Sequence, residues 1–275
     1  MSTHAGQLSL ALLPTAPVDQ AFASVLAQRL GLPLLPVGSD PGRNEQVDAI
    51  VIVSGEAVLV QQTGRAAPGP VAADFGGTAM RHRRRSGHNE LLGKAVGVGK
   101  KQRLRVLDAT AGLGRDSFVL ADLGCDVLLC ERDPVIVELL LAGMRVATAH
   151  GDSWLDEVLG RMRLCPGDAR EAPTASLAGV DVIYLDPMFP QRTQSAAVKK
   201  EMALLQQLLP SLEDAGQPEV LLRWALEQPV ARIVLKRPRK APLLDDRKPS
   251  HSLQGKSIRF DVFVKRALES ASAGH

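Results

Sequence analysis

The residues that could do chemistry follow an apolar run, Val182–Leu185, and read Asp186-Pro187-Met188-Phe189. The β-branched and aromatic content of the run predicts a buried strand, which Pro187 ends because proline cannot donate to a sheet ladder. Open α/β sheets bind ligands at the carboxyl ends of their strands. There, the Asp186 carboxylate and the Pro187 carbonyl could accept the two N–H groups of an exocyclic amine. The Phe189 ring could stack on the planar base that carries this amine.

A second motif, Asp108-Ala-Thr-Ala-Gly112-Leu-Gly114, lies upstream. An apolar run precedes it and residues 115–123 follow it with helix-like spacing, which predicts a strand, a glycine turn and a helix. The amino end of such a helix is a place where the backbone can approach a ligand. The next predicted strand ends in Glu131, 17 residues beyond Gly114. An acid at this position can hydrogen-bond both ribose hydroxyls of an adenosine cofactor.

This geometry alone fits both NAD and S-adenosylmethionine. The dinucleotide fingerprint requires a third glycine where this chain has Ser117, so the pyrophosphate signature is incomplete. Asp108, at the end of the first strand, also suits a sulfonium and amino-acid ligand better than a phosphate. The Asp186-Pro187-Met188-Phe189 element resembles the Asp/Asn-Pro-Pro-Tyr/Phe signature of amino-directed methyltransferases. Methyl transfer is therefore favoured, with Met188 packed beside the methyl group.

Several segments between residues 70 and 265 together resemble the ribosomal small-subunit rRNA methyltransferase J family. They are Gly76-Gly-Thr-Ala-Met-Arg-His-Arg-Arg-Arg85, Asp108-Ala-Thr-Ala-Gly-Leu-Gly-Arg-Asp116, Tyr184-Leu-Asp-Pro-Met-Phe-Pro190, Val198-Lys-Lys-Glu-Met202, Val234-Leu-Lys-Arg-Pro238 and Arg259-Phe-Asp261. The resemblance implies a Rossmann-like methyltransferase that transfers a methyl group from S-adenosylmethionine to the exocyclic N2 amine of one guanine in 16S rRNA. Carried over by motif, the implied cofactor contacts are Arg115, Asp116, Glu131, Arg132 and Asp186, with the turn at Asp168 and Ala169.

The turn is where the chain departs from the family, because Pro166-Gly-Asp-Ala169 stands in place of a small polar pair. Asp168 could still bond an adenine amine. Two other functions remain open. One is an amino methyltransferase acting on DNA or on a protein glutamine. The other is a nucleotide-binding oxidoreductase or a catalytically silent RNA-binding domain, although Asp186 and Phe189 argue against an oxidoreductase.

The net charge of +3 is unevenly distributed along the chain. Residues 76–105 carry 9 Lys and Arg against 1 acidic residue, residues 106–188 carry 6 against 14, and residues 189–270 carry 15 against 9. Basic segments on both sides of an acidic cofactor core predict a cationic rim for a polyphosphate substrate, here 16S rRNA or the 30S subunit. The predicted RNA contacts are Arg81, Arg83, Arg84, Arg85, Lys199, Lys200, Lys236 and Arg237. For Lys199 and Lys200, a solvated helix face is the alternative.

Alternating strands and helices must position these residues. Strands are predicted at 104–107, 126–130, 181–185, 231–236 and 258–264, and helices at 115–123, 134–148, 195–209 and 219–227. This order predicts an α/β fold with a doubly wound, mostly parallel sheet and an antiparallel last strand. Residues 1–70 are expected to form a small N-terminal α/β domain. Residues 71–270 would form the methyltransferase domain, including a basic linker, 76–105.

Composition disfavours several other classes. No apolar stretch is long enough for a membrane helix, and the Met-Ser-Thr-His start lacks the basic residues of a secretory signal. The three cysteines cannot all pair, and the six histidines show no metal-ligand spacing. We therefore expect a cytoplasmic enzyme with reduced thiols, no metal and no membrane attachment.

Overall fold

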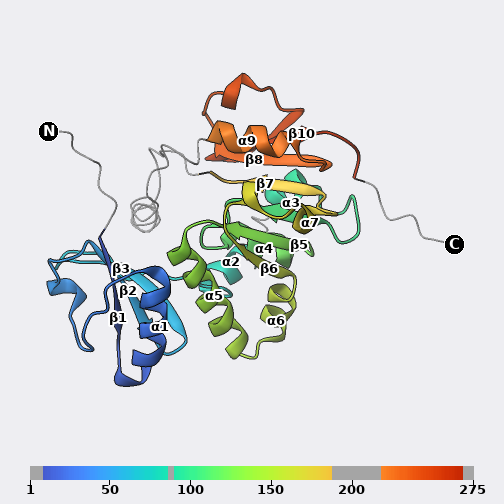
Figure 1. Ribbon diagram of the computed structural model, residues 1–275. Coiled ribbons are helices and arrows are strands. Elements are labelled where there is room, and N and C mark those ends of the chain that lie inside the picture. Colours follow the sequence, from blue (N-terminus) through green and yellow to red (C-terminus); the bar gives the residue numbers. More distant parts are fainter. Residues whose placement is uncertain (1–8, 86–89, 188–217, 269–275) are drawn as a thin grey trace, which may run out of the picture.

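The computed structural model describes residues 9–85, 90–187 and 218–268. The chain forms two β-sheets, each covered by helices (Figure 1). The smaller sheet has the strand order β1-β2-β3, and the larger has the order β6-β5-β4-β7-β8-β10-β9. Strands that are adjacent in the larger sheet are often distant in sequence, so helical crossovers must connect them.

The smaller sheet is built from residues near the amino terminus. Its strands are β1 (Leu10–Pro14), β2 (Ala49–Ser54) and β3 (Ala57–Gln62), and the helix α1 (Gln20–Leu30) packs against β1. β1 and β2 are parallel, whereas β2 and β3 form an antiparallel hairpin. β3 in turn contacts the helix α5 (Pro134–Ala149), so the smaller sheet packs directly on the larger unit.

Seven strands form the larger sheet. They are β4 (Arg105–Asp108), β5 (Asp126–Glu131), β6 (Met162–Pro166), β7 (Val182–Leu185), β8 (Arg232–Pro238), β9 (His251–Gln254) and β10 (Ile258–Val264). Neighbouring pairs from β6 to β8 are parallel, and β10 is antiparallel to both β8 and β9. The predicted α/β class, the mostly parallel sheet and the antiparallel last strand are confirmed.

The helices of the larger unit begin where the sequence supplies caps. The Asp133 side chain accepts from the N–H groups of Val135 and Ile136 at the start of α5, and Pro134 occupies the first helical position. Asp152 caps α6 (Ser153–Leu159) in the same way. The remaining helices are α2 (Thr78–Arg85), α3 (Glu90–Val96), α4 (Arg115–Asp122), α7 (Thr174–Leu177) and α9 (Pro218–Glu227).

Some elements were not predicted from the sequence. β6 was expected only as a turn, and β9 was not expected at all. Both are edge strands, and β9 is mostly exposed, with the sequence His-Ser-Leu-Gln, so neither has the apolar pattern of a central strand. The helices α2, α6 and α7 were also missed. The predicted helix 195–209 lies outside the described residues.

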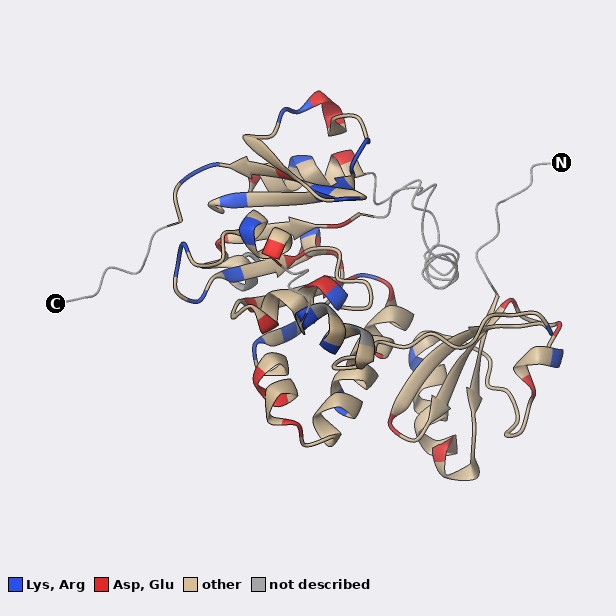
Figure 2. Cartoon of the chain, turned by 180° about the vertical axis from the view of Figure 1, so that it is seen from behind, with Lys and Arg blue, Asp and Glu red and all other residues tan. Residues whose placement is uncertain are grey.

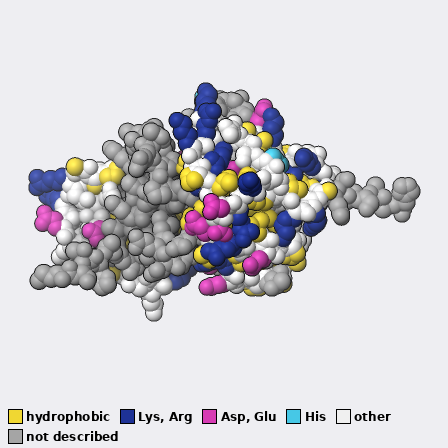
Figure 3. Space-filling model, turned by 90° about the horizontal axis from the view of Figure 1, so that it is seen from above, with side chains coloured by type: hydrophobic (Ala, Val, Ile, Leu, Met, Phe, Trp, Pro, Cys, Tyr) yellow, Lys and Arg dark blue, Asp and Glu magenta, His cyan; other side chains and the backbone are white. Residues whose placement is uncertain are grey.

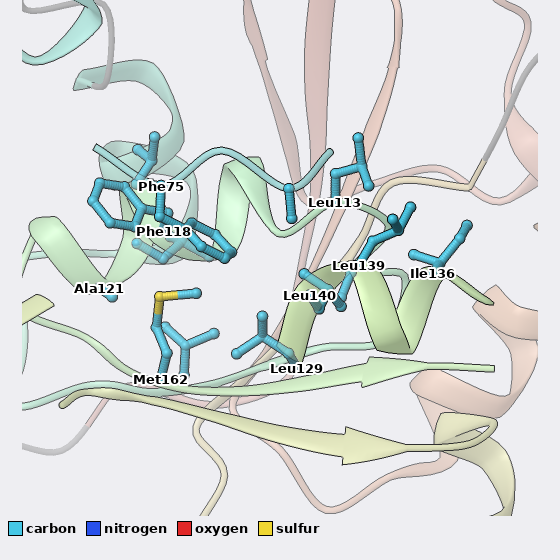
Figure 4. Packing of buried hydrophobic residues seen from close by; sticks show 14 of the residues in the cluster. Phe75, Leu113, Phe118, Ala121, Leu129, Ile136, Leu139, Leu140 and Met162 are labelled. Carbon is cyan, nitrogen blue, oxygen red and sulfur yellow. The ribbon is translucent and has the colours of Figure 1, made fainter. Parts of the chain in front are cut away.

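Buried apolar side chains cover both faces of the larger sheet. On one face, α4 and α5 pack over β5 and β6, where Phe75 stacks on Phe118 with ring centroids 5.6 Å apart. Figure 4 shows Leu129, Leu140 and Met162 pointing into the same space. On the other face, α9 covers Ile233 and other residues of β8. Residues of the smaller sheet also belong to the first of these clusters. The domain boundary expected at residue 70 stays a prediction.

Gly143, in the middle of α5, offers a test of this packing. A Cβ atom at this position would overlap the carbonyl oxygen of Ala73, in the segment that joins the two sheets. We expect Gly143→Ala to lower the free energy of unfolding by about 1–3 kcal/mol, the usual cost of overpacking. Without Ala73 against this face, alanine would instead stabilise the helix by roughly 0.5–1 kcal/mol. Urea denaturation gives the sign, and the exposed Thr148→Ala in the same helix is the control.

Candidate active site

Charged side chains gather at one edge of the larger sheet. β4 to β8 run parallel, so their carboxyl ends meet along this edge. Asp108 ends β4 and Glu131 ends β5, while Asp168 follows β6, Asp186 follows β7 and Lys236 lies near the end of β8. The sequence singled out all five residues, and the topology brings them to the edge at which open α/β sheets bind ligands.

The glycine turn after β4 has two distinct halves. Gly112 and Gly114 have φ values of 52° and 72°, a region that side chains other than glycine rarely adopt. Among the described residues, a Cβ atom on Gly112 would have no neighbour within 4 Å beyond the adjoining chain, whereas one on Gly114 would lie 2.9 Å from Leu140 and 3.0 Å from Phe75. Gly112 therefore borders open space that a ligand could fill, and Gly114 allows the turn to pack on the core.

Glu131 connects this turn to the end of the neighbouring strand. Its Oε2 accepts from the Gly112 N–H at 2.8 Å, and its Oε1 accepts from the Asp133 N–H at 2.9 Å. The residue is only 7% exposed, and burial raises the pKa of its carboxyl group. Because a carboxylate oxygen can accept two hydrogen bonds, Glu131 keeps acceptor capacity for ribose hydroxyls.

Asp108 is buried under the same turn. Its Oδ2 accepts from the Ser117 hydroxyl at 2.5 Å, and its Oδ1 accepts from the Thr110 N–H at 3.0 Å. Burial raises the pKa of Asp108 to about 7, with smaller contributions from the charges of Asp116 and Asp186. Ser117, which replaces the third glycine of a dinucleotide fingerprint, thus has a role in this fold: it anchors the carboxyl group that supports the turn.

Two carboxylates share one ammonium group beside the turn. Lys236 Nζ lies 2.7 Å from Asp186 Oδ2 and 2.6 Å from Asp116 Oδ2. The hydroxyl of Tyr184 also donates to Asp116 Oδ2, at 2.6 Å. The backbone N–H of Asp186 donates to the Thr110 hydroxyl at 2.7 Å, which fixes the chain as it leaves β7. Pro187 is buried behind it.

The pKa values and the exposure of this cluster distinguish its two acids, Asp186 and Asp116. Burial alone would lower the pKa of Lys236, but the two adjacent carboxylates raise it above its ordinary value. Burial raises the pKa of Asp186, and the Lys236 ammonium opposes that rise. The Asp186 side chain is 35% exposed and that of Asp116 only 11%. Asp186 is therefore the accessible acceptor, and Asp116 is its buried counterpart.

Asp168 is engaged by an arginine that the sequence analysis did not select. Its Oδ1 accepts from the backbone N–H and Nε of Arg170, both at 2.9 Å, and its Oδ2 accepts from Nη2 at 2.6 Å. Burial raises the pKa of Asp168, but the Arg170 bonds outweigh burial and bring it below its ordinary value. A carboxylate has about four acceptor positions. The one that remains on Oδ2 can accept an adenine amine.

The remaining predicted cofactor residues lie around this edge. Ala169 is buried and begins the 3-10 turn η3 (Ala169–Glu171). Arg132 is half-buried and close enough to Asp168 to lower the pKa of its carboxyl group. Arg115 is exposed at the first position of α4. The structure therefore brings the predicted residues to one edge, and their individual contacts with a cofactor stay predictions.

Three contributors to the site were missed from the sequence. Tyr184 is the single tyrosine of the chain and lies two residues before Asp186, a spacing that puts both on one face of a strand. Thr110 lies inside the glycine motif and links Asp108 to the backbone of Asp186. The pairing of Arg170 with Asp168 depends on the 3-10 turn, which the sequence did not reveal.

Two of the arginines predicted to form a cationic rim, Arg81 and Arg84, contact a tryptophan of α6. The Arg81 and Arg84 guanidinium groups lie over the Trp154 ring, 4.8 Å and 4.9 Å from its centroid. Arg81 pairs with Asp152 at 2.6 Å, and Arg84 pairs with Asp122 at 3.1 Å. Asp122 is the last residue of α4, a helix length of about 12 Å from the glycine turn. These contacts fasten α2 to α4 and α6, and the RNA contacts predicted for Arg81 and Arg84 stay predictions.

Arg237, another predicted RNA contact, is a buried residue. It is only 5% exposed, and burial, together with nearby Arg259, lowers the pKa of its guanidinium. Its neighbour Lys236 points to the opposite face of β8, as strand geometry requires. The RNA contact predicted for Arg237 stays a prediction. Met188, Phe189, Lys199 and Lys200, and the side chains of Arg83 and Arg85, lie outside the described part of the chain.

Metal ligands and membrane-spanning helices were both expected to be absent. Within residues 9–85, 90–187 and 218–268, no cluster of three or more His, Cys, Asp or Glu could hold a metal ion. None of the helices in these ranges is both long and apolar enough to cross a bilayer.

Known proteins match this chain over most of its length. The model of the SAM-dependent methyltransferase family SAM_MT matches residues 38–265. The ribosomal RNA small subunit methyltransferase J of Pseudomonas paraeruginosa is 46% identical over 248 residues, covering 89% of this chain and 90% of the relative. The protein of the same name from Stutzerimonas stutzeri is 46% identical over 262 residues, covering 94% and 96%.

A solved structure agrees with these sequence matches. The crystal structure of a SAM-dependent methyltransferase from Neisseria gonorrhoeae has a TM-score of 0.68 and 30% identity, covering 96% of this chain and 100% of that one. Together with the glycine turn, Glu131 and the Asp186 cluster at one sheet edge, these matches show that the chain is a SAM-dependent methyltransferase of the ribosomal RNA small subunit methyltransferase J family.

Proposed function

We propose that this enzyme transfers a methyl group from S-adenosylmethionine to the exocyclic N2 amine of one guanine in 16S rRNA. The observation that carries the proposal is the accessible Asp186 carboxylate, held by Lys236 beside the glycine turn. An acceptor of N–H groups at that position suits an amine on a planar base. The names of the relatives, which refer to small-subunit ribosomal RNA, support this substrate.

The residues at the edge fit the cofactor. Gly112 leaves open space beside the turn, and Glu131 and Asp168 retain acceptor capacity for ribose hydroxyls and an adenine amine. Arg115 and Arg132 lie at the same edge and complete the proposed contact set. S-adenosylmethionine supplies an electrophilic methyl group on a sulfonium. Three carboxyl groups, those of Asp108, Asp116 and Asp186, lie in this neighbourhood, and their ionised forms suit a cationic ligand.

Asp186 has the central role in the proposed mechanism. The lone pair of a guanine N2 amine is delocalised into the ring, so the amine is a weak nucleophile. Asp186 and the Pro187 carbonyl would accept its two N–H groups and orient the lone pair for in-line attack. The N–H becomes acidic as the new N–C bond forms, so the Asp186 carboxylate need not be a strong base to hold the proton. Phe189 would stack on the base and Met188 would pack beside the methyl group.

The other substrates share part of this logic. Amino methyltransferases that act on DNA or on a protein glutamine share the logic of the Asp-Pro-x-Phe element. The names of the relatives do not favour either of these substrates. With an rRNA substrate, we also expect the enzyme to act in the cytoplasm. Incubation with labelled S-adenosylmethionine and either 30S subunits or naked 16S rRNA, followed by mapping of the methylated nucleotide, tests the proposal. A label on any group other than a guanine amine would contradict it.

Glu131→Gln should weaken the binding of S-adenosylmethionine. The substitution keeps the size of the side chain but removes its charge and one acceptor oxygen, so we expect a loss of about 1–3 kcal/mol. Isothermal titration calorimetry measures the affinity, and exposed Glu157→Gln is the matched control. Equal affinities for the two variants would remove Glu131 from the cofactor site.

Asp186→Ala should abolish methylation while S-adenosylmethionine still binds. The methyl side chain accepts no hydrogen bond, and it lacks the charge that pairs with Lys236. Methyl transfer to 30S subunits measures the effect, with exposed Asp156→Ala as the control. A variant that binds the cofactor and retains near-normal turnover would rule out the proposed role.

Lys236→Met should shift the acidic limb of the pH–rate profile to higher pH. Asp186 must be ionised to accept the amine, and removal of the ammonium raises the pKa of its carboxyl group. Activity should therefore be lost first on the acidic side and recover as the pH rises. Lys236→Arg, which keeps the charge, should restore much of the original profile. An unshifted profile for Lys236→Met would show that Lys236 does not control the ionisation of Asp186.

A further inference from the structure

A second group of cations lies at the same edge of the sheet. β8 continues past Lys236 to Pro238, and Arg239 and Lys240 follow directly. At about 3.3 Å per strand residue, the backbone of Arg239 is roughly 10 Å from that of Lys236. Since the Lys236 ammonium contacts Asp186, these two cations leave the sheet beside the proposed amine site.

Lys256 reaches the same place from another strand. It lies in the turn between β9 and β10, where Pro238 is opposite Ile258. The backbone N–H of Arg239 donates to the carbonyl of Ser257 at 2.9 Å, so the turn is directly bonded to the residue that follows β8. We call Arg239, Lys240 and Lys256 the edge cations.

The edge cations are exposed, and no acidic residue of the described chain forms an ion pair with any of them. Several other basic residues of the chain differ in this respect. Arg81 and Arg84 are paired with acids, Arg237 is buried and Arg247 pairs with Asp245. The edge cations therefore combine an open position with charge that no ion pair within the described residues neutralises.

A buried arginine fixes the backbone that carries two of them. The Arg259 guanidinium donates to the carbonyls of Arg239 at 3.1 Å and Ala241 at 2.6 Å. It pairs with Asp261 of the same strand, which also accepts from the Ser252 hydroxyl. The segment after β8 is thus held in place before any ligand arrives, which lowers the entropic cost of binding.

The connection from β8 to β9 places charge on an exposed face. In Figure 2, this connection carries Lys and Arg on both sides of the acidic turn η4 (Leu244–Asp246). Figure 3 looks down on this part of the molecule and shows several groups of Lys and Arg side chains on the exposed face, alongside fewer Asp and Glu side chains.

We propose that Arg239, Lys240 and Lys256 form the surface that binds the rRNA phosphates flanking the target guanine. This inference rests on the proposed function. A base that enters the site must leave its stack, so its own strand has to pass along the rim. Cations at this distance can neutralise phosphates of that strand while the base reaches Asp186.

The test compares two triple variants in which three cations become glutamine. One replaces Arg239, Lys240 and Lys256. The matched control replaces Lys100, Arg105 and Arg266, which are exposed at the amino end of β4 or beyond the end of antiparallel β10, and therefore lie at the opposite edge. Affinities for 30S subunits and for naked 16S rRNA are measured over a range of salt concentrations, together with S-adenosylmethionine affinity and methylation kinetics.

For the edge variant, we expect the log–log salt slope to fall by roughly 2–3, or about 0.7–0.9 per lost phosphate contact. The KM for RNA should rise while kcat at saturation and S-adenosylmethionine affinity stay unchanged, and the control should behave like the wild type. A loss of affinity for 30S subunits alone would show that only the assembled particle presents the contacted phosphates. A loss of affinity for both substrates would show that the naked rRNA presents them as well.

Two results would contradict the inference, and they can be told apart. If the wild type methylates rRNA but the two triple variants have equal salt slopes, the edge cations are not the RNA surface and the proposed function still holds. If the wild type methylates neither RNA, the proposed function fails and takes this inference with it. Single variants Lys240→Glu and Lys256→Glu should each show a smaller change in the same direction as the triple variant.

Discussion

The ammonium group of Lys236, placed between Asp116 and Asp186, is the interaction on which the site depends. It joins β8 to the end of β7 and to the start of α4. Asp108 lies nearby, so the edge collects three carboxyl groups in a partly buried place. Removing one partner of such a cluster leaves an uncompensated buried charge, which costs several kcal/mol. The Lys236 ammonium allows these acids to stay close together, and their closeness is what gives the edge its chemistry.

Much of this site could be predicted because it depends on local chain geometry. A glycine turn followed by a helix, an acid at the next strand end and an Asp-Pro after an apolar strand each indicate a position relative to the sheet. Parallel strands then bring those positions to one edge without further information. The antiparallel last strand and the central strands were predicted on the same basis. Edge strands β6 and β9 were not, because few of their residues face an apolar core.

Contacts between distant segments could not be predicted in this way. Residues 76–105 are strongly basic and residues 106–188 strongly acidic, which suggested an exposed cationic rim. In the fold, arginines of the first segment pair with Asp122 and Asp152 of the second. The two charge blocks therefore neutralise each other in part. Lys236 and Arg237 are another example. Adjacent residues of a strand point to opposite faces, so Lys236 lies between two carboxylates whereas Arg237 is buried. What matters for a polyanion is charge that stays exposed and unpaired, and a sum over sequence does not measure it.

The glycine turn and Asp186 are also joined by a short path of covalent and hydrogen bonds. Thr110 donates its N–H to Asp108 under the glycine turn and accepts from the backbone of Asp186 at the end of β7. Asp116, in the first turn of α4, reaches the same lysine as Asp186. The backbone that would hold the methyl donor and the side chain that would hold the acceptor are thus positioned by the same few residues. Methyl transfer requires in-line alignment of donor and acceptor, and displacements of about 1 Å can cost a hundredfold in rate. A rigid connection between the turn and Asp186 meets that requirement before either substrate binds.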